Sequence, residues 1–206
     1  VRTEPGYEPA PGTLPRGHYA WKLPDQNKDA FMDRRDLLPY HQAFIDLIDP
    51  LRYPAKGVSP ADLREMRRLK ARMEAERLPR GADPALHVKL GRGGLSDVEW
   101  VAQLQQLEHA QEIPELRTTQ TLTVLEQSVV LGLIQEQDSE RLVDAWRLAS
   151  AIRNAIMLSS GRASDSVPTD LRVLGRVGHL LGYSPENRSL LPEDYRRLTR
   201  RARQVM

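Results

Sequence analysis

The chain contains the segment His87-Val-Lys-Leu-Gly-Arg-Gly-Gly-Leu-Ser-Asp-Val-Glu-Trp-Val-Ala-Gln103, in which three glycines directly precede an apolar pattern of helical period. Glycine adopts positive φ without strain and lets another backbone or a ligand approach closely. A helix that begins near Leu95 directs unpaired N–H groups and the positive end of its dipole toward these glycines. Lys89 and Arg92 add two positive charges. The segment therefore indicates an anion site, for which phosphate is the usual ligand.

A plain turn that binds no ligand is the alternative, because glycine-rich turns commonly open helices. Two known phosphate-binding motifs are excluded. No Gly-Lys-Ser/Thr follows at the spacing of a P-loop, and no strand of alternating pattern precedes the glycines, as a dinucleotide fingerprint requires. The interpretation therefore depends on the sequence around the segment.

Apolar residues recur at helical spacing through most of the chain. Ser59, Pro60 and Asp62 form a clear helix start. Later starts are expected at Thr118 or Thr119, at Asp138 or Ser139, at Thr169 or Asp170, and at Pro192. Helices are thus predicted at about residues 33–48, 59–78, 95–112, 119–131, 139–159, 169–181 and 192–206.

Residues 1–32 hold many prolines and glycines and are expected to form a flexible arm. The predicted fold is an all-α bundle of about seven helices with an extended Pro/Gly-rich N-terminal arm. The helical domain is expected at residues 33–206. The composition, with 28% charged and 5% aromatic residues, suits such a protein better than a β-sandwich.

The composition also argues against several function classes. The net charge of +2 gives little support for nucleic-acid binding, and no apolar run approaches the ~18–20 residues of a membrane span. No Cys is present, which excludes disulfides and suits a reducing compartment. No signal peptide is recognised. We expect a cytoplasmic protein that contacts neither nucleic acid nor membrane and has no metal site in this chain.

The segment from Lys89 to Trp100 resembles the signature Lys-x-x-x-Gly-Gly-Ile/Leu-x-Asp-Ile/Val-Glu-Phe/Trp of glutamine synthetase adenylyltransferases. The resemblance covers about residues 45–206 and looks most like the actinobacterial branch. Further stretches that carry it are Asp49-Pro-Leu-Arg-Tyr-Pro54, Arg67-Arg-Leu-Lys-Ala-Arg-Met-Glu-Ala-Glu-Arg77, Leu116-Arg-Thr-Thr119, Arg153-Asn-Ala-Ile-Met-Leu158 and Asp194-Tyr-Arg-Arg-Leu-Thr-Arg-Arg-Ala202.

The resemblance implies the helical domain that follows a nucleotidyltransferase domain in a bifunctional enzyme. That enzyme transfers AMP from ATP to a tyrosine of glutamine synthetase and removes it again, and so regulates nitrogen assimilation. The implied cofactors of the whole enzyme are ATP and Mg²⁺. The implied partners are its own nucleotidyltransferase domain and glutamine synthetase, with a PII-type signalling protein as a further candidate. The metal-binding Gly-Ser…Asp-x-Asp pattern is not found here, so we expect no catalytic residue in this chain and no activity of the chain alone.

The resemblance further implies that the segment completes a nucleotide pocket as a lid. Lys89 and Arg92 would face a phosphate, and Gly93 and Gly94 would let it approach the backbone. Asp97 and Glu99 lie about 200° apart around a helix and cannot bind one metal together. Asp97 is expected to hold the glycines, and Glu99 to face a basic ridge or the cleft.

Two other groups are candidates for nucleotide contacts. The predicted helix 59–78 carries a basic ridge formed by Arg64, Arg68 and Arg72. Arg68 and Arg72, together with Lys70, are expected to face phosphate. The alternative is a solvated face whose charges pair with one another. In the helix 139–159, Arg153 and Asn154, with Arg147, could bond a base or ribose, or simply tie helices together.

Two other function classes stay open. One is a helical domain like that of PII uridylyltransferases, which share a Gly-Gly-Leu-x-Asp helix start. The other is a purely structural or regulatory bundle that docks a protein and never contacts nucleotide.

Overall fold

The computed structural model describes residues 34–206, so the expected N-terminal arm lies outside the described residues. The chain divides into two compact units, Val1–Ala55 and Lys56–Met206, which are treated separately here. The domain boundary placed before residue 33 stays a prediction. Over the described residues the class is all-α with seven α-helices, as predicted, and no strand is formed there apart from one isolated bridge.

The described part of the first unit holds helix α1, Arg34–Arg52. It continues past the predicted end near residue 48. The Tyr53 N–H donates to the Asp49 carbonyl over 2.8 Å, so helical bonding resumes after Pro50. The Arg52 guanidinium also lies 3.5 Å from the Asp49 carboxylate. Tyr40, Phe44 and other apolar side chains of α1 are exposed.

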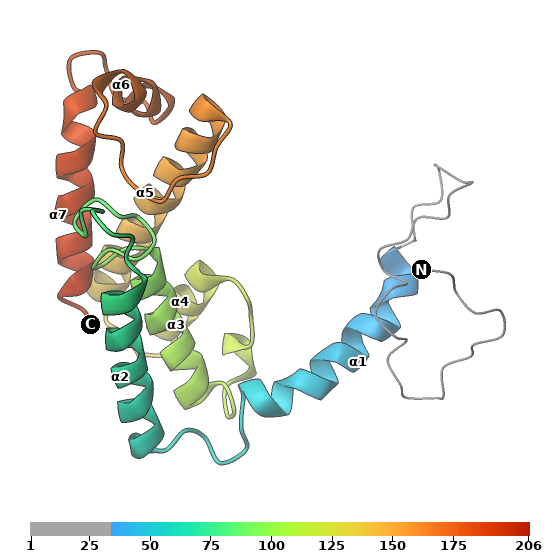
Figure 1. The fold of residues 1–206 in the computed structure, drawn as a ribbon. Helices are drawn as coiled ribbons and strands as arrows, with labels where there is room; N and C mark the ends of the chain where they lie inside the picture. Colours follow the sequence, from blue (N-terminus) through green and yellow to red (C-terminus); the bar gives the residue numbers. More distant parts are fainter. Residues whose placement is uncertain (1–33) are drawn as a thin grey trace. The chain divides into compact units, whose positions relative to one another are not determined.

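The second unit contains six α-helices and two short 3-10 turns (Figure 1). Their bounds are α2 Pro60–Arg77, α3 Leu95–His109, α4 Thr121–Val130, α5 Glu136–Ser160, α6 Leu171–Leu180 and α7 Leu191–Arg203, with turns at Pro114–Leu116 and Arg188–Leu190. None of the helices among residues 34–206 combines the length and the apolarity needed to cross a membrane.

The predicted helix starts are partly confirmed. Ser59 and Asp62 form a reciprocal capping box at α2, and Asp170 caps α6. The starts of α4 and α5 were predicted wrongly. Both begin after a Gln with no side-chain cap, and α5 starts at Glu136, so Asp138 and Ser139, the two expected caps, lie within its first turn. Acidic Glu136 and Asp138 in its first turn suit the helix dipole instead.

Helix α5 is the centre of the second unit and packs against α3, α4, α6 and α7. Helix α5 contacts α7, and in Figure 1 the two helices are inclined to each other, with the C-terminal end of α5 farther from α7. Its predicted stripe is buried at Leu142, Ala149, Ile152 and Ile156, and Trp146 is half-buried. On α7, Leu191 and Tyr195 complete the same core.

Helix α2 is attached differently. Leu69 and Met73, which the sequence assigns to its apolar face, are 49% and 40% exposed. None of the α2 side chains that the structure describes is fully buried. Ion pairs join α2 to the rest of the unit, from Lys70 to Asp97 at the start of α3 and from Glu74 to Arg203 of α7.

Candidate functional site

The segment 87–97, which we call the glycine segment, begins with a two-stranded contact. The Val88 N–H donates to the Asp165 carbonyl over 2.7 Å, and the Val167 N–H donates to the Leu86 carbonyl over 2.8 Å. Val88 is completely buried. The start of the segment is thereby fixed to the connection between α5 and α6.

The three glycines allow close packing within the protein. Gly93 has φ +74°, and a Cβ added to it would lie 2.0 Å from the carbonyl oxygen of Thr199 on α7. A Cβ at Gly91 would lie 2.3 Å from the His87 carbonyl oxygen, and one at Gly94 would lie 2.8 Å from the Val88 carbonyl oxygen. No real side chain fits at such distances. The backbone that approaches these glycines is thus that of α7 and of the segment itself.

The N–H groups at the start of α3 are occupied by the same segment. Leu95 donates to the Val88 carbonyl over 2.9 Å, and Ser96 donates to the Lys89 carbonyl over 3.0 Å. Gly94 donates to the Gly91 carbonyl over 2.9 Å. The N–H groups of Gly93 and Gly94 thus have partners within the protein, the Asp97 carboxylate and the Gly91 carbonyl. The expectation that these glycines let a phosphate approach the backbone stays a prediction.

Asp97 binds the glycine segment to two helices that are distant in sequence. Its carboxylate accepts from the Gly93 N–H over 2.6 Å, from the Lys70 ammonium of α2, and from the Arg203 guanidinium of α7 over 3.2 Å. The Asp97 side chain is only 3% exposed. The expectation that Asp97 holds the glycines is confirmed. The α2 residue that faces this helix start is Lys70, which pairs with Asp97.

Opposing effects act on the pKa of Asp97. Burial raises this pKa, because a carboxylate loses its hydration inside the protein. The hydrogen bonds from Lys70 and from the Gly93 N–H, and the Lys70 charge, act in the opposite direction and outweigh burial. The pKa of Asp97 is therefore lowered, and the carboxylate is ionised at neutral pH.

The neighbours of Asp97 balance its charge. Lys70 also bonds Glu74, and Arg203 lies 4.0 Å from the same Glu74 carboxylate. Two acids and two bases thus form one neutral cluster, which we call the Asp97 cluster. A Mg²⁺ ion does not fit there, because an ammonium group already occupies the space between the two carboxylates. No group of three or more candidate ligands occurs in the described part of the chain.

His87 fixes the first turn of the glycine segment. Its Nδ1 accepts from the Leu90 N–H over 3.0 Å, and its carbonyl accepts from the Tyr195 hydroxyl over 3.3 Å. Burial lowers the pKa of His87, and the nearby Asp165 charge opposes this only in part. The neutral ring that can accept the Leu90 N–H is therefore favoured.

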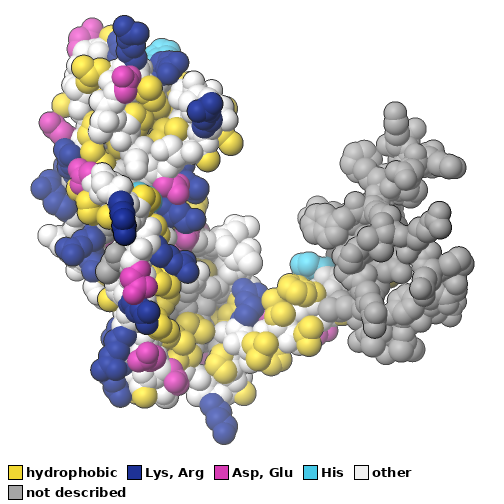
Figure 2. Space-filling model, in the orientation of Figure 1, with side chains coloured by type: hydrophobic (Ala, Val, Ile, Leu, Met, Phe, Trp, Pro, Cys, Tyr) yellow, Lys and Arg dark blue, Asp and Glu magenta, His cyan; other side chains and the backbone are white. Residues whose placement is uncertain are grey.

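Lys89 and Arg92 are the cations that this arrangement leaves available. Both side chains are exposed, and neither forms an ion pair with another residue of 34–206. Glu99 is half-buried and likewise has no ion-pair partner there. Figure 2 shows Lys and Arg side chains along the α2 and α7 side of this unit. Sequence reasoning placed Lys89 and Arg92 on this segment, and the structure shows both side chains exposed; their role toward a phosphate stays a prediction.

The other predicted site residues are separate from this segment or already paired. Arg68 lies 3.6 Å from Glu65 and Arg72 lies 2.8 Å from Glu76, so these exposed arginines pair along α2. Arg153 lies 2.6 Å from the Asp165 carboxylate and reaches the start of the glycine segment through Asp165. Asn154 is exposed.

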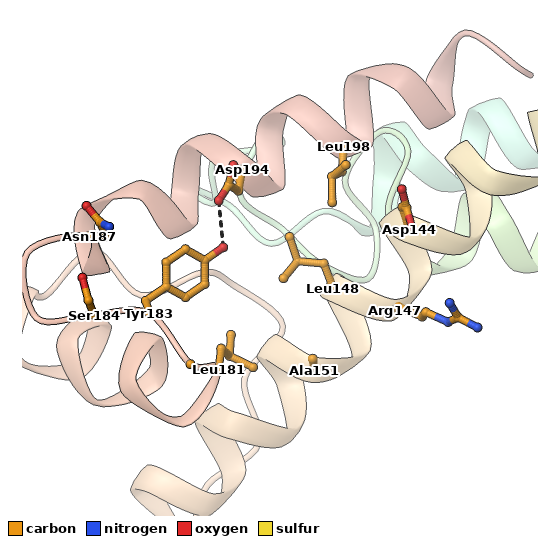
Figure 3. A pocket seen from close by; sticks show the side chains of 11 residues that line it. Asp144, Arg147, Leu148, Ala151, Leu181, Tyr183, Ser184, Asn187, Asp194 and Leu198 are labelled. Atoms are coloured by element: carbon orange, nitrogen blue, oxygen red, sulfur yellow. Dashed lines mark hydrogen bonds between the residues drawn. The ribbon is translucent and has the colours of Figure 1, made fainter. Parts of the chain in front are cut away.

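A cavity of about 700 Å³ lies between α5, the connection 181–187 that follows α6, and α7 (Figure 3). The Tyr183 hydroxyl donates to Asp194 over 2.9 Å, and Arg197 donates to the same carboxylate over 2.7 Å. Burial and this bond raise the pKa of Tyr183 to about 12. Arg147, at the edge of the cavity, points away from this pair in Figure 3. The polar groups of Tyr183 and Asp194 are therefore used within the protein.

The network around Asp97 could not be found by sequence reasoning alone. Lys70 and Arg203 lie 27 and 106 residues from Asp97 in the chain. Thr199, which closes over Gly93, lies in the stretch Asp194–Ala202 that carries the resemblance, but nothing in that stretch indicates contact with the glycines. The sequence did place Lys70 among the basic residues of α2 that were expected to face a ligand. It did not indicate that Lys70 pairs with Asp97.

Comparison with known proteins gives consistent matches. A family model described as GlnD PII-uridylyltransferase matches residues 64–206. The bifunctional glutamine synthetase adenylyltransferase/adenylyl-removing enzyme of Streptomyces avermitilis is 58% identical over 165 residues, which are 80% of this chain and 16% of that protein. The proteins of the same name from Streptomyces coelicolor and Mycobacterium leprae are 56% and 48% identical over 79% of this chain. The chain thus spans about 16% of the length of these relatives.

Proposed function

Because the chain belongs to the helical family described as GlnD PII-uridylyltransferase, and is similar to adenylyltransferases of that family, we propose that it is a helical region of a bifunctional glutamine synthetase adenylyltransferase. In this proposal the whole enzyme attaches AMP from ATP to a glutamine synthetase tyrosine and removes it. The 58% identity to the Streptomyces avermitilis enzyme is the observation that carries the proposal.

The geometry suggests what this region contributes. The Asp97 cluster joins the glycine segment to α2 and α7, so the segment has a fixed position. Lys89 and Arg92 on this segment are exposed and have no ion-pair partner among residues 34–206. We propose that they stabilise the charge of the ATP phosphates beside a nucleotidyltransferase domain, since phosphoryl-type transfer depends largely on positioning and charge neutralisation.

The remaining candidates would act around this pair. Glu99 and Asn154 are proposed to contact the nucleotide or the catalytic domain, because Glu99 forms no ion pair with a described residue and the Asn154 amide is exposed. Arg68, Arg72 and Arg153 already contact a carboxylate, which reduces the charge that they offer to a phosphate. Gly93, Gly94 and Asp97 are proposed as positioning residues that hold the segment.

The chemistry itself is proposed to occur elsewhere in the enzyme. Among the described residues, the acids beside the glycine segment, buried Asp97 and half-buried Glu74, are neutralised by Lys70 and Arg203, so they do not suit Mg²⁺. Mg²⁺ and the transfer step are therefore assigned to a nucleotidyltransferase domain, and the chain alone is expected to be inactive. Its proposed partners are that domain and glutamine synthetase, with a PII-type protein as a candidate regulator.

A chimeric enzyme tests the proposal. The matching 16% of the Streptomyces avermitilis protein is replaced by the corresponding residues of this chain. We expect the chimera to transfer AMP to glutamine synthetase at a rate within about threefold of the parent, because conserved packing preserves positioning. Incorporation of radiolabelled AMP measures the rate. A folded chimera that neither adds nor removes AMP would reject the proposal.

A docking bundle that never meets nucleotide is the second candidate, favoured by the exposed apolar side chains of α2. This candidate predicts that loss of the Lys89 charge leaves AMP transfer unchanged and weakens only the binding of glutamine synthetase. Loss of the Lys89 charge therefore distinguishes the two candidates: the first predicts a lower rate of AMP transfer, and the second predicts weaker binding of glutamine synthetase.

A further inference from the structure

A groove of about 930 Å³ lies between α2, the connection 78–92 and α7. Its apolar part is formed by Leu78, Pro84, Ala85 and Leu90. Four arginines also line it, namely Arg92, Arg196, Arg200 and Arg203. Its volume is in the range of about 300–1,000 Å³ that is typical of small-molecule sites.

Two of the four arginines are neutralised within the protein. Arg196 lies 3.6 Å from Asp83, and Arg203 lies 3.2 Å from Asp97 and 4.0 Å from Glu74. Arg92 and Arg200 have no such carboxylate within residues 34–206, and both are exposed. The groove therefore keeps the charge of two guanidinium groups, although acids also line its wall.

The fold brings these two arginines together. A Cβ at Gly93 would lie 2.0 Å from the Thr199 carbonyl oxygen, so the two backbones touch at this point. Arg92 directly precedes Gly93, and Arg200 directly follows Thr199. The contact that requires glycine at position 93 thus places one arginine from the glycine segment beside one from α7.

A ligand that satisfies this groove carries several negative charges at one end and a flat, largely apolar body at the other. We propose that the groove binds a nucleoside di- or triphosphate, with Arg92 and Arg200 bonded to the phosphate chain and the apolar side chains beneath the nucleoside. Guanidinium groups suit phosphate because they donate two parallel hydrogen bonds. This inference deepens the proposed function and rests on it, since it names the groove and adds Arg200 to the phosphate-binding residues.

Calorimetric titration of the full 206-residue chain tests this assignment. The probes are ATP, inorganic tripolyphosphate and adenosine, and the variants are Arg92→Ala, Arg200→Ala and the control Arg201→Ala. Arg201 is exposed, lies next to Arg200 on α7 and does not line the groove. Its replacement by Ala therefore removes the same charge without changing the groove. Circular dichroism verifies that each variant is folded.

We expect Arg92→Ala and Arg200→Ala each to weaken ATP binding by about tenfold, which is typical for loss of one charged hydrogen bond, and Arg201→Ala to change it by less than about twofold. ATP should bind more tightly than tripolyphosphate, because the apolar wall contacts the nucleoside. Equal loss in Arg200→Ala and Arg201→Ala would show only general charge attraction and would overturn the site. Equal affinity for ATP and tripolyphosphate would also overturn the site, as would the absence of ATP binding by the wild-type chain.

The outcome is separable from that of the proposed function. Unchanged ATP binding by Arg200→Ala, together with AMP transfer by the chimera, rejects the groove alone. Binding that depends on Arg200, together with a folded chimera that transfers no AMP, rejects the proposed function alone.

Discussion

Asp97 shows at the scale of one residue how a buried charge is maintained in this protein. Its carboxylate loses most of its hydration, which by itself destabilises the ionised form. The Gly93 N–H, Lys70 and Arg203 replace the lost water, and they come from three different parts of the unit. The charge of this one side chain therefore links the glycine segment to α2 and α7.

Replacement of Asp97 by Ala should lower the free energy of unfolding by about 3–5 kcal/mol, because it leaves Lys70 and the Gly93 N–H without their buried acceptor. Urea denaturation measures this change. Asp138→Ala is the matched control, since Asp138 pairs with Arg141 over 3.0 Å at the surface. This control should cost less than about 1 kcal/mol. Equal costs for the two variants would contradict the role given to Asp97.

The free energies of unfolding of the wild type and of the Asp97→Ala variant should depend differently on pH. The pKa of Asp97 is lower in the folded protein, so below about pH 4 the unfolded chain binds the proton more readily than the folded one. The contribution of Asp97 is thus present above that pH and is lost as the pH falls through the folded pKa. The free energy of unfolding should therefore fall less steeply with acid in the Asp97→Ala variant than in the wild type.

The sequence predicted part of this residue-scale network. An acid in the first turn after three glycines indicated that Asp97 holds the segment, and that contact is present. The partners Lys70 and Arg203 could not be predicted, because a pattern within one helix does not show which distant helix packs against it. The proposed roles of Lys89 and Arg92 toward a nucleotide stay predictions.

At the scale of elements, the contact between the glycine segment and α7 explains a feature that the sequence left ambiguous. The glycines indicated a close approach, and both a ligand and a turn could have supplied it. The structure shows that the backbone of α7 fills the space at Gly93. Helix starts with strong side-chain caps, such as Ser59 and Asp170, were predictable, whereas the uncapped starts of α4 and α5 were not.

Gly93→Ala should be far more destabilising than Gly132→Ala, although both glycines have positive φ. Gly132 has no atom within 4 Å of an added Cβ, so that variant bears only the backbone strain, about 1–2 kcal/mol. Gly93→Ala adds a clash with α7, and we expect about 4 kcal/mol or more. Thermal unfolding of both variants measures the difference. Similar midpoints would show that α7 does not close over Gly93.

At the scale of the whole molecule, an all-α unit of moderate size holds one polar cluster near the junction of α2, α3 and α7. The periodicity and composition of the sequence were sufficient to predict the helical class. The weak burial of α2 was not predictable, because its apolar spacing is that of an ordinary packed helix. The chain covers 16% of the length of its relatives, so its function has to be measured in a protein of their size.

The central claim is that the glycine segment presents its cations to the nucleotide. The most direct test compares the rate of AMP transfer between two variants of the chimeric enzyme, Lys89→Ala and Lys56→Ala. Lys56 is an exposed lysine outside the segment. We predict about a tenfold lower rate for Lys89→Ala, as expected for loss of one charged contact to phosphate, with unchanged binding of glutamine synthetase. The Lys56→Ala control should match the parent chimera. An unchanged rate in Lys89→Ala would contradict the claim and favour the docking bundle.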